Sequence, residues 1–143
     1  MTAYLIAAVA GYAVGSVPFA HLVVRRRSGL DLHAAGSENV GANNAFRVTG
    51  SRGVGVLVLL LDALKGGGAV LLGWWLALEF RMDDQFHGDR VVWVMGAVAL
   101  LSAVAGHNYN AVLSLRAGRL VGGKGLATGA GGFALLAPGA LLA

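Results

Sequence analysis

The chain has 143 residues, of which 57% are hydrophobic and 13% are charged. A soluble domain of this size carries roughly a quarter charged residues, so this composition, with a mean hydropathy of +0.70, excludes an ordinary water-soluble domain. The net charge of +4 and the pI of about 10.1 would suit a nucleic-acid-binding protein. However, the charges are distributed among the loops as they are in membrane proteins. We therefore expect no nucleic acid partner.

Four long apolar runs predict transmembrane helices. Residues 1–24 contain no Asp, Glu, Lys or Arg, and as a helix this run is roughly 36 Å long, enough to cross a hydrocarbon core of about 30 Å. The predicted spans cover residues of about 2–24, 53–78, 91–113 and 125–143. The runs are too long for strands, and the first lacks the basic start of a secretory signal. We therefore predict an all-α, multi-pass bundle of about four spans that forms a single membrane domain over residues 1–143.

The loop charges predict the orientation of this bundle. Residues 25–52 carry a net charge of +3, residues 79–90 carry −2 and residues 114–124 carry +3. Because cytoplasmic loops are rich in Lys and Arg, the first and third loops should face the cytoplasm, which places the N-terminus outside. The residues expected in an interfacial aromatic belt flank the acidic loop: Trp74, Trp75 and Trp93.

The sequence GSVPF at residues 15–19 places a proline near the cytoplasmic end of the first span. Proline removes a backbone donor and frees a carbonyl, and a nearby hydroxyl such as that of Ser16 can help to satisfy the backbone. The motif predicts a helix kink, and whether the kink also faces a substrate stays open.

The first cytoplasmic loop contains GSENVGANNAFR at residues 36–47. Its small residues let the backbone come close to a ligand, its Ser and Asn side chains offer donors, and the guanidinium of Arg47 matches the geometry of a phosphate. We interpret this segment as an anion-binding loop. A plain Gly/Asn turn is the alternative.

Asp62 and Lys65 interrupt the second apolar run and, three residues apart, lie on one face of the predicted helix. Ionisable residues inside a membrane are costly and usually face a bundle interior or an aqueous cavity. Because Lys65 is followed by three glycines, we favour a role in phosphate binding over a purely structural ion pair.

The fourth polar region comprises GHNYN, which contains His107, and GGKGLAT at residues 122–128. Residues 118–124 nearly spell the GxxxxGK loop of nucleoside triphosphatases, but Gly125 stands where the metal-binding Ser or Thr belongs and no strand precedes it. The glycines still expose backbone N–H groups, Lys124 adds charge, and the fourth span begins there with the positive end of its dipole. We predict a phosphate site here, with His107 either functional or a packing residue.

The same inventory argues against cofactors. The chain has no cysteine, and its four histidines lack the HExxH-like spacing of zinc enzymes. Without a complete nucleotide-binding loop or a recognisable ligand cluster, we expect no metal and no other cofactor.

Taken in order, GSVPF, GSENVGANNAFR, LLDALKGG and GH…GGKGLAT resemble the signature of the PlsY family, the acyl-phosphate-dependent glycerol-3-phosphate acyltransferases. The motifs extend from Gly15 to Thr128, nearly the whole chain. The resemblance implies an enzyme of bacterial phospholipid synthesis that transfers a fatty acyl group from acyl phosphate to sn-glycerol 3-phosphate, giving lysophosphatidic acid. It also implies a multi-pass protein of the cell (inner) membrane, surrounded by the lipid bilayer, with the acyl-phosphate-producing enzyme as a partner.

Position by position, the resemblance implies a site built from both halves of the chain. The expected substrate-binding residues are Ser37, Asn39, Gly41, Asn44, Arg47, Lys65, Gly122, Gly123, Lys124, Gly125 and Thr128. The residues expected to act in catalysis are His107, Arg47 and Lys124. Acyl phosphate has a good leaving group, so positioning and electrostatic stabilisation should dominate a direct attack. Either His107 or a phosphate oxygen of the substrate would take the proton.

The chain departs from the family pattern at three residues and in the length of one segment. Glu38 replaces Gly, Asn43 replaces Thr, Asn110 replaces Pro, and the stretch from His107 to Lys124 is longer. An acid at position 38 should weaken phosphate binding unless its carboxylate turns away. The family also continues with further spans and a C-terminal motif. We therefore expect a fragment, a truncated paralogue or a protein completed by another subunit.

Two other functions stay open at this point. One is an inactive relative that binds lipid phosphates without transferring an acyl group. The other is a small transporter or channel, in which Asp62, Lys65 and His107 would line the pore.

Overall fold

A computed structural model describes residues 1–80 and 88–138, and within these ranges every regular element is a helix. The elements in chain order are α1 (Thr2–Gly15), α2 (Phe19–Ser28), the 3-10 helix η1 (Leu32–Ala34), α3 (Ala42–Thr49), α4 (Arg52–Glu79), α5 (Gly88–Asn108), α6 (Ala111–Ala117) and α7 (Leu126–Leu136). The predicted all-α fold is confirmed.

Three stretches of the described chain are long and apolar enough to cross a bilayer: Thr2–Ser28, Arg52–Glu79 and Arg90–Ala117. A fourth apolar helix, Leu126–Leu136, is shorter. The predicted fourth span extends to residue 143, and its last five residues lie outside the described ranges. The count of about four spans and the outward N-terminus therefore stay predictions.

The first apolar stretch is divided by a break between α1 and α2, where we predicted a kink. Pro18 cannot donate a helical hydrogen bond, and its ring disfavours an unbroken helix. Two side chains from distant parts of the chain occupy the carbonyls that the break exposes. Lys65 donates from Nζ to the Val17 carbonyl (3.0 Å), and Asn110 donates from Nδ2 to the Ser16 carbonyl (2.5 Å). Irregular backbone at membrane depth is tolerated when protein groups satisfy it in this way.

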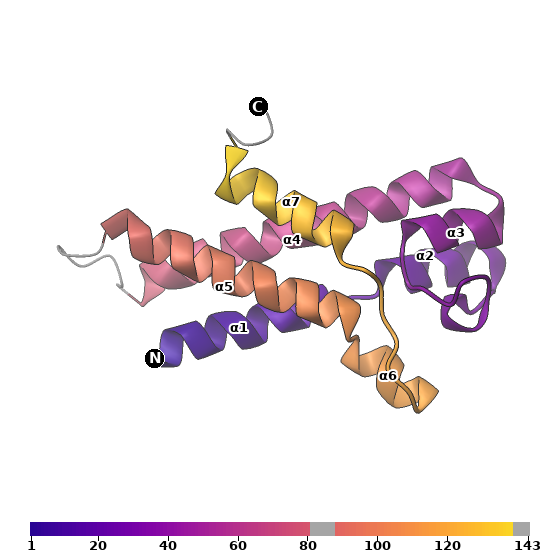
Figure 1. Ribbon diagram of the computed structural model, residues 1–143, viewed down its shortest axis with the longest axis horizontal. Helices are drawn as coiled ribbons and strands as arrows, with labels where there is room; N and C mark the ends of the chain where they lie inside the picture. The colour runs from indigo at the N-terminus through magenta and orange to yellow at the C-terminus, as the bar shows by residue number, and fades with distance from the viewer. Residues whose placement is uncertain (81–87, 139–143) are drawn as a thin grey trace.

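The long helices pack through small residues that let their backbones approach closely. Helix α1 lies along α5, and α4 contacts α1, α5 and α7 (Figure 1). A Cβ added to Gly15 of α1 would overlap the Ala103 carbonyl of α5, and one added to Gly66 of α4 would overlap the Thr128 carbonyl of α7. Close packing of this kind is a main source of helix association in membranes, where lipid tails remove the hydrophobic drive.

The outer face of the bundle is apolar. Exposed leucines recur at helical spacing along α4: Leu57, Leu60, Leu64, Leu71 and Leu78. Such a stripe would be unfavourable against water and is typical of a surface that faces lipid. Near one end of the bundle, Trp74 and Trp93 meet edge to face with their ring centroids 5.2 Å apart, consistent with the expected aromatic belt.

A compact cap at the other end of the bundle positions the polar loops. Helices α2, α3 and α6 and the start of α4 share a buried apolar cluster that includes Val24, Leu32, Val58 and Leu113. The loop residues Val40 and Val121 complete the cluster: they lie in the first and third predicted loops. The two loops are therefore anchored by the same core.

Replacing Gly15 by Ala should destabilise the bundle. The new Cβ would overlap the Ala103 carbonyl, and overpacking a close contact costs about 1–3 kcal/mol. Gly68→Ala is the matched control, because a Cβ at Gly68 meets no atom within 4 Å and Ala favours a helix over Gly. Thermal unfolding of both variants in one detergent checks the expectation. A Tm of Gly15→Ala at or above that of the unaltered chain would contradict it.

The predicted orientation can be tested with single cysteines, because the chain has none of its own. Ser51 and Arg119 lie at the end of the bundle that carries the apolar cap, and Phe80 lies at the opposite end. An impermeant thiol reagent applied from outside should label Phe80→Cys, while Ser51→Cys and Arg119→Cys should react only after permeabilisation. The reverse pattern would overturn the prediction. Residue 83, in the middle of the acidic loop, lies outside the described residues.

Candidate active site

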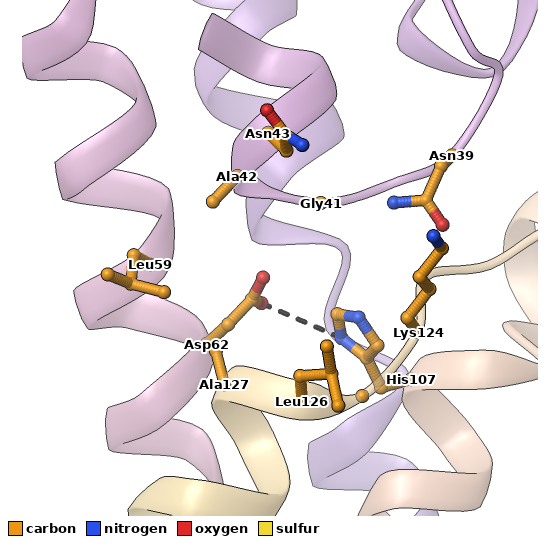
Figure 2. Close-up of a pocket in the computed structure, with 11 residues that line it drawn as sticks. Asn39, Gly41, Ala42, Asn43, Leu59, Asp62, His107, Lys124, Leu126 and Ala127 are labelled. Carbon is orange, nitrogen blue, oxygen red and sulfur yellow. Dashed lines mark ion pairs between the residues drawn. The ribbon is translucent and has the colours of Figure 1, made fainter.

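A pocket of about 280 Å³ lies where the loop before α3, the middle of α4, the end of α5 and the start of α7 meet. Its lining combines residues from all four segments: Asn39, Gly41, Ala42, Asn43, Leu59, Asp62, His107, Lys124, Gly125, Leu126 and Ala127. Figure 2 shows Asp62 and His107 on one side and Asn39 and Lys124 on another. Residues far apart in the sequence thus share one cavity.

Two lining residues of this pocket, Asp62 and His107, belong to a buried charge network. Asp62 Oδ1 lies 3.1 Å from Lys65 Nζ, one helical turn further along α4, and 3.7 Å from His107 Nδ1 on α5 (Figure 2). All three side chains are buried. The carboxylate therefore joins α4 to α5 and carries the negative charge that Lys65 balances.

The described lining of the pocket does not include Lys65. Its ammonium is held by Asp62 and by the Val17 carbonyl at the helix break, and it lies 5.7 Å from the centroid of the Phe19 ring. The proposed contact of Lys65 with phosphate stays a prediction. Its observed contacts show how the ion pair supports the helix break.

One backbone hydrogen bond joins the two polar loops, and a second joins the third loop to His107 at the end of α5. Val40 N–H donates to the Gly122 carbonyl (3.0 Å), and Gly123 N–H donates to the His107 carbonyl (2.9 Å). The approach requires glycine at position 123, because a Cβ there would overlap the imidazole of His107. The segments 36–47 and 122–128, both predicted to bind anions, therefore adjoin.

The pocket has a positive end that suits an anion. Helix α7 starts after Gly125, which adopts a left-handed conformation (φ 69°), and its first hydrogen bond runs from Gly129 N–H to the Gly125 carbonyl. The N–H groups before that bond have no partner inside the helix. Lys124 is exposed and extends toward Asn39 (Figure 2). A helix N-terminus and an ammonium together favour binding of phosphate.

The structure divides the predicted site residues into two groups. Those that line the pocket are Asn39, Gly41, His107, Lys124 and Gly125. Those outside its described lining are Ser37, Asn44, Arg47, Lys65, Gly122, Gly123 and Thr128. Gly122 and Gly123 shape the pocket through the hydrogen bonds above, Thr128 is buried where α7 crosses α4, and Arg47 is exposed on α3.

Asn44 has a structural role that its sequence context did not indicate. Its Oδ1 accepts a hydrogen bond from Ser37 N–H (2.9 Å), and its Nδ2 donates to the carbonyls of Leu32 (3.2 Å) and Ala35 (3.0 Å). The buried amide thus folds the loop that leads to the pocket. Because these backbone contacts occupy its side chain, Asn44 would affect a substrate by positioning Asn39 and Gly41.

Sequence reasoning missed several parts of the pocket. Asp62 was not among the predicted substrate-binding or catalytic residues, and the apolar lining was not anticipated: Ala42, Leu59, Leu126 and Ala127. The signal for Asp62 was present, since an intramembrane carboxylate is a functional candidate by itself. Apolar lining residues have no such signal, because they resemble any lipid-facing or core residue.

The carboxylate of Glu38 turns away from the pocket. It lies 2.7 Å from a guanidinium nitrogen of Arg119, and the same nitrogen donates to the His33 carbonyl (2.9 Å). Glu38 has a positive φ of 60°, a conformation that glycine adopts readily and that is strained for other residues. The acid that was expected to oppose phosphate binding is therefore paired with a residue of the longer third loop.

An apolar groove adjoins the polar pocket between α3 and α4. It has a volume of about 300 Å³ and shares three lining residues with the pocket: Ala42, Asn43 and Leu59. The remaining lining is Phe46, Arg52, Gly55 and Val56. Because Phe46, Val56 and Leu59 are exposed on the outer surface, the groove connects the polar pocket with the lipid-facing side.

Comparison with known proteins gives consistent results. The family model described as glycerol-3-phosphate acyltransferase matches residues 5–143. Glycerol-3-phosphate acyltransferase 4 of Dehalococcoides mccartyi is 38% identical over 135 residues, which are 94% of this chain and 50% of that protein. Glycerol-3-phosphate acyltransferase of Thermus thermophilus is 41% identical over 138 residues, which are 96% of this chain and 59% of that protein.

A solved structure is also similar: the crystal structure of PlsY, an integral membrane glycerol 3-phosphate acyltransferase, in its glycerol 3-phosphate form. The TM-score is 0.72 and the identity is 32%, over 97% of this chain and 60% of the other. This chain therefore spans little more than half the length of the relatives that it matches. The similarity and the apolar helices identify it as a multi-pass membrane protein.

The buried ion pair predicts an asymmetry between single and double substitutions. Lys65→Met should lower the free energy of unfolding by about 3–5 kcal/mol, because it leaves the Asp62 carboxylate buried and unpaired. Asp62→Leu combined with Lys65→Met should recover much of this loss. Thermal and denaturant unfolding of purified, monodisperse variants would measure both. A double variant as unstable as Lys65→Met would show that the pair is not the source of the effect.

Proposed function

Because this chain belongs to the glycerol-3-phosphate acyltransferase family, we propose that it transfers a fatty acyl group from acyl phosphate to sn-glycerol 3-phosphate. The 1-hydroxyl oxygen attacks the acyl carbonyl carbon, the bond from that carbon to the phosphate oxygen breaks, and lysophosphatidic acid and inorganic phosphate leave. The proton of the hydroxyl passes to a phosphate oxygen. No covalent enzyme intermediate is required, because phosphate is a good leaving group.

The junction of a pocket with a cationic end and an apolar groove is the observation that carries this proposal. Both substrates bear a phosphate, which suits Lys124 and the start of α7. Acyl phosphate also bears a hydrocarbon chain, which suits the groove over Leu59 and Phe46. A molecule with its phosphate in the pocket and its chain in the groove would place its acyl carbonyl near the shared residues Ala42 and Asn43.

The site residues take roles that follow from their positions. Lys124 would stabilise the negative charge that develops on the departing phosphate. His107 lies 3.7 Å from Asp62 and lines the pocket, where it would orient the attacking hydroxyl. Asn39 would donate hydrogen bonds from across the pocket. Arg47 would have to reach glycerol 3-phosphate from the exposed surface of α3, and we retain it as a substrate contact on the resemblance alone.

The surroundings of the enzyme are part of the same proposal. A multi-pass protein with this substrate would work in the cell (inner) membrane and receive acyl phosphate from the enzyme that makes it. The proposed transfer uses no cofactor, because the leaving group is already activated and the cationic pocket supplies the electrostatic stabilisation.

Lys124→Met should reduce acyl transfer by about 10- to 150-fold, because a charge-assisted contact to phosphate is worth roughly 1.5–3 kcal/mol in a partly dehydrated site. The matched control is Arg27→Met, which removes an exposed cationic side chain of α2 outside the pocket and should act like the unaltered chain. The assay measures lysophosphatidic acid formed from acyl phosphate and labelled glycerol 3-phosphate in proteoliposomes. Near-native kinetics of Lys124→Met would remove the main support for the phosphate site.

The same assay separates the enzyme from an inactive relative. Glycerol 3-phosphate binding is measured in parallel on each variant by equilibrium dialysis. Binding without any acyl transfer by the unaltered chain would favour a phosphate-binding relative that has lost catalysis. Near-native acyl transfer by the Asp62→Leu and Lys65→Met double variant would exclude the proposed contact of Lys65 with phosphate.

A further inference from the structure

Three side chains with metal-binding atoms meet outside the pocket, where α2 faces η1. His21 lies on α2, Asp31 precedes η1 and His33 lies within it. The Nδ1 atoms of His21 and His33 lie 3.2 Å and 2.8 Å from the same oxygen of Asp31, and the three donor atoms all lie within 4.8 Å of one another. The two imidazoles are stacked with their centroids 5.6 Å apart, so both rings present Nδ1 to one carboxylate oxygen.

These close contacts are not hydrogen bonds. Within the described residues, His21 Nδ1, Asp31 Oδ1 and His33 Nδ1 have no hydrogen-bond partner, and all three atoms are shielded from solvent. The His21 side chain is 5% exposed, and buried polar atoms are rarely left without a partner. In a metal site the lone pairs of the ligand atoms point at the ion, which lies off the line that joins any two ligand atoms. Two ligand atoms can therefore be close together without being aligned for a hydrogen bond.

We propose that His21, Asp31 and His33 bind a divalent transition-metal ion. Two neutral imidazoles and a carboxylate suit Zn²⁺ and its first-row neighbours. Bonds of about 2.0–2.1 Å in tetrahedral geometry separate two ligands by roughly 3.3 Å. The His21–Asp31 separation of 3.2 Å matches this value, and the His33–Asp31 separation of 2.8 Å is shorter. The three ligand atoms are shielded from solvent, but the Asp31 side chain as a whole is 41% exposed, so the cluster lies next to solvent.

An arrangement without metal explains the cluster less well. Two neutral imidazoles could each donate an Nδ1–H to Asp31, but neither contact has the geometry of a hydrogen bond. Protonation of both imidazoles would stack two positive rings around a single negative charge. Coordination requires neutral imidazoles, which removes this repulsion, and the ion itself neutralises the carboxylate. The metal therefore accounts for the burial, the stacking and the shared oxygen together.

The ion would have a structural role. Leu32, between Asp31 and His33, is fully buried, and its carbonyl accepts a hydrogen bond from Asn44. A metal bound to both neighbours of Leu32 and to His21 would fasten η1 to α2, and with it the loop that leads to the pocket. None of the three ligands lines the pocket, so no step of the proposed acyl transfer passes through this ion.

The experiment measures metal binding directly on the purified chain, prepared without a histidine tag and stripped with a chelator. Titration with Zn²⁺ against a chromophoric chelator should give one ion per chain. His33→Gln and Asp31→Asn should each weaken the affinity by at least about 100-fold, since even loss of a partner behind a ligand costs 10- to 100-fold. Co²⁺ in the same site should show the intense visible bands of four-coordinate geometry.

The matched control is His107→Gln, which removes a histidine that lies beside Asp62 and does not belong to the cluster of His21, Asp31 and His33. It should bind Zn²⁺ like the unaltered chain. Asp31→Asn changes a partly exposed side chain, so this variant should fold even if His33→Gln does not. It then still allows the affinity for Zn²⁺ to be compared with that of the unaltered chain. Substoichiometric Zn²⁺, six-coordinate Co²⁺ spectra, or affinities that Asp31→Asn leaves unchanged would each overturn the proposal. Because activity is not measured, the result is independent of the proposed acyl transfer.

Discussion

A charge buried among apolar helices is the constraint on which the rest of this structure depends. The Lys65 ammonium lies inside the second span, where an unpaired charge costs about 2.5–3.5 kcal/mol or more. Its two partners are Asp62 on its own helix and the Val17 carbonyl. In an intact first helix that carbonyl would be engaged by the helix itself, so the break at Pro18 makes it available to Lys65. The polar pocket forms beside the carboxylate that this arrangement places at the centre of the bundle.

Close helix packing turns that charge network into a cavity with a defined shape. Glycines at the crossings bring α1 against α5 and α4 against α7, so Asp62 and His107 meet across helices and the start of α7 reaches the same place. Membrane helices associate through contact rather than through exclusion of water, and small residues make such contact possible. Because the helices pack so closely, a single helix separates a bundle-facing surface from a lipid-facing surface. The polar pocket therefore lies next to an apolar groove.

Two of the residues that depart from the family pattern, Glu38 and Asn110, make specific contacts within the structure. Glu38 pairs with Arg119 of the longer third loop, which directs its charge away from the pocket and joins the first loop to the third. Asn110 accepts a hydrogen bond from Leu113 N–H (3.0 Å) as the cap of α6 and donates to the Ser16 carbonyl at the helix break. An exposed ion pair contributes little stability. The main effect of the contact between Glu38 and Arg119 is therefore to fix the position of the Glu38 charge.

The sequence by itself determined the class of protein, because hydrophobic runs and loop motifs are local patterns. Composition excluded a soluble domain, the second apolar run matches α4, and four ordered motifs identified the family. The tertiary structure decided which side chains meet. Asn44, which we predicted to contact a substrate, donates hydrogen bonds to the carbonyls of Leu32 and Ala35, and its contact with a substrate stays a prediction. His21 and His33, whose spacing in the sequence gave no signal, share the carboxylate of Asp31. A side chain's partners depend on the positions of distant backbone atoms, and a linear pattern does not specify those positions.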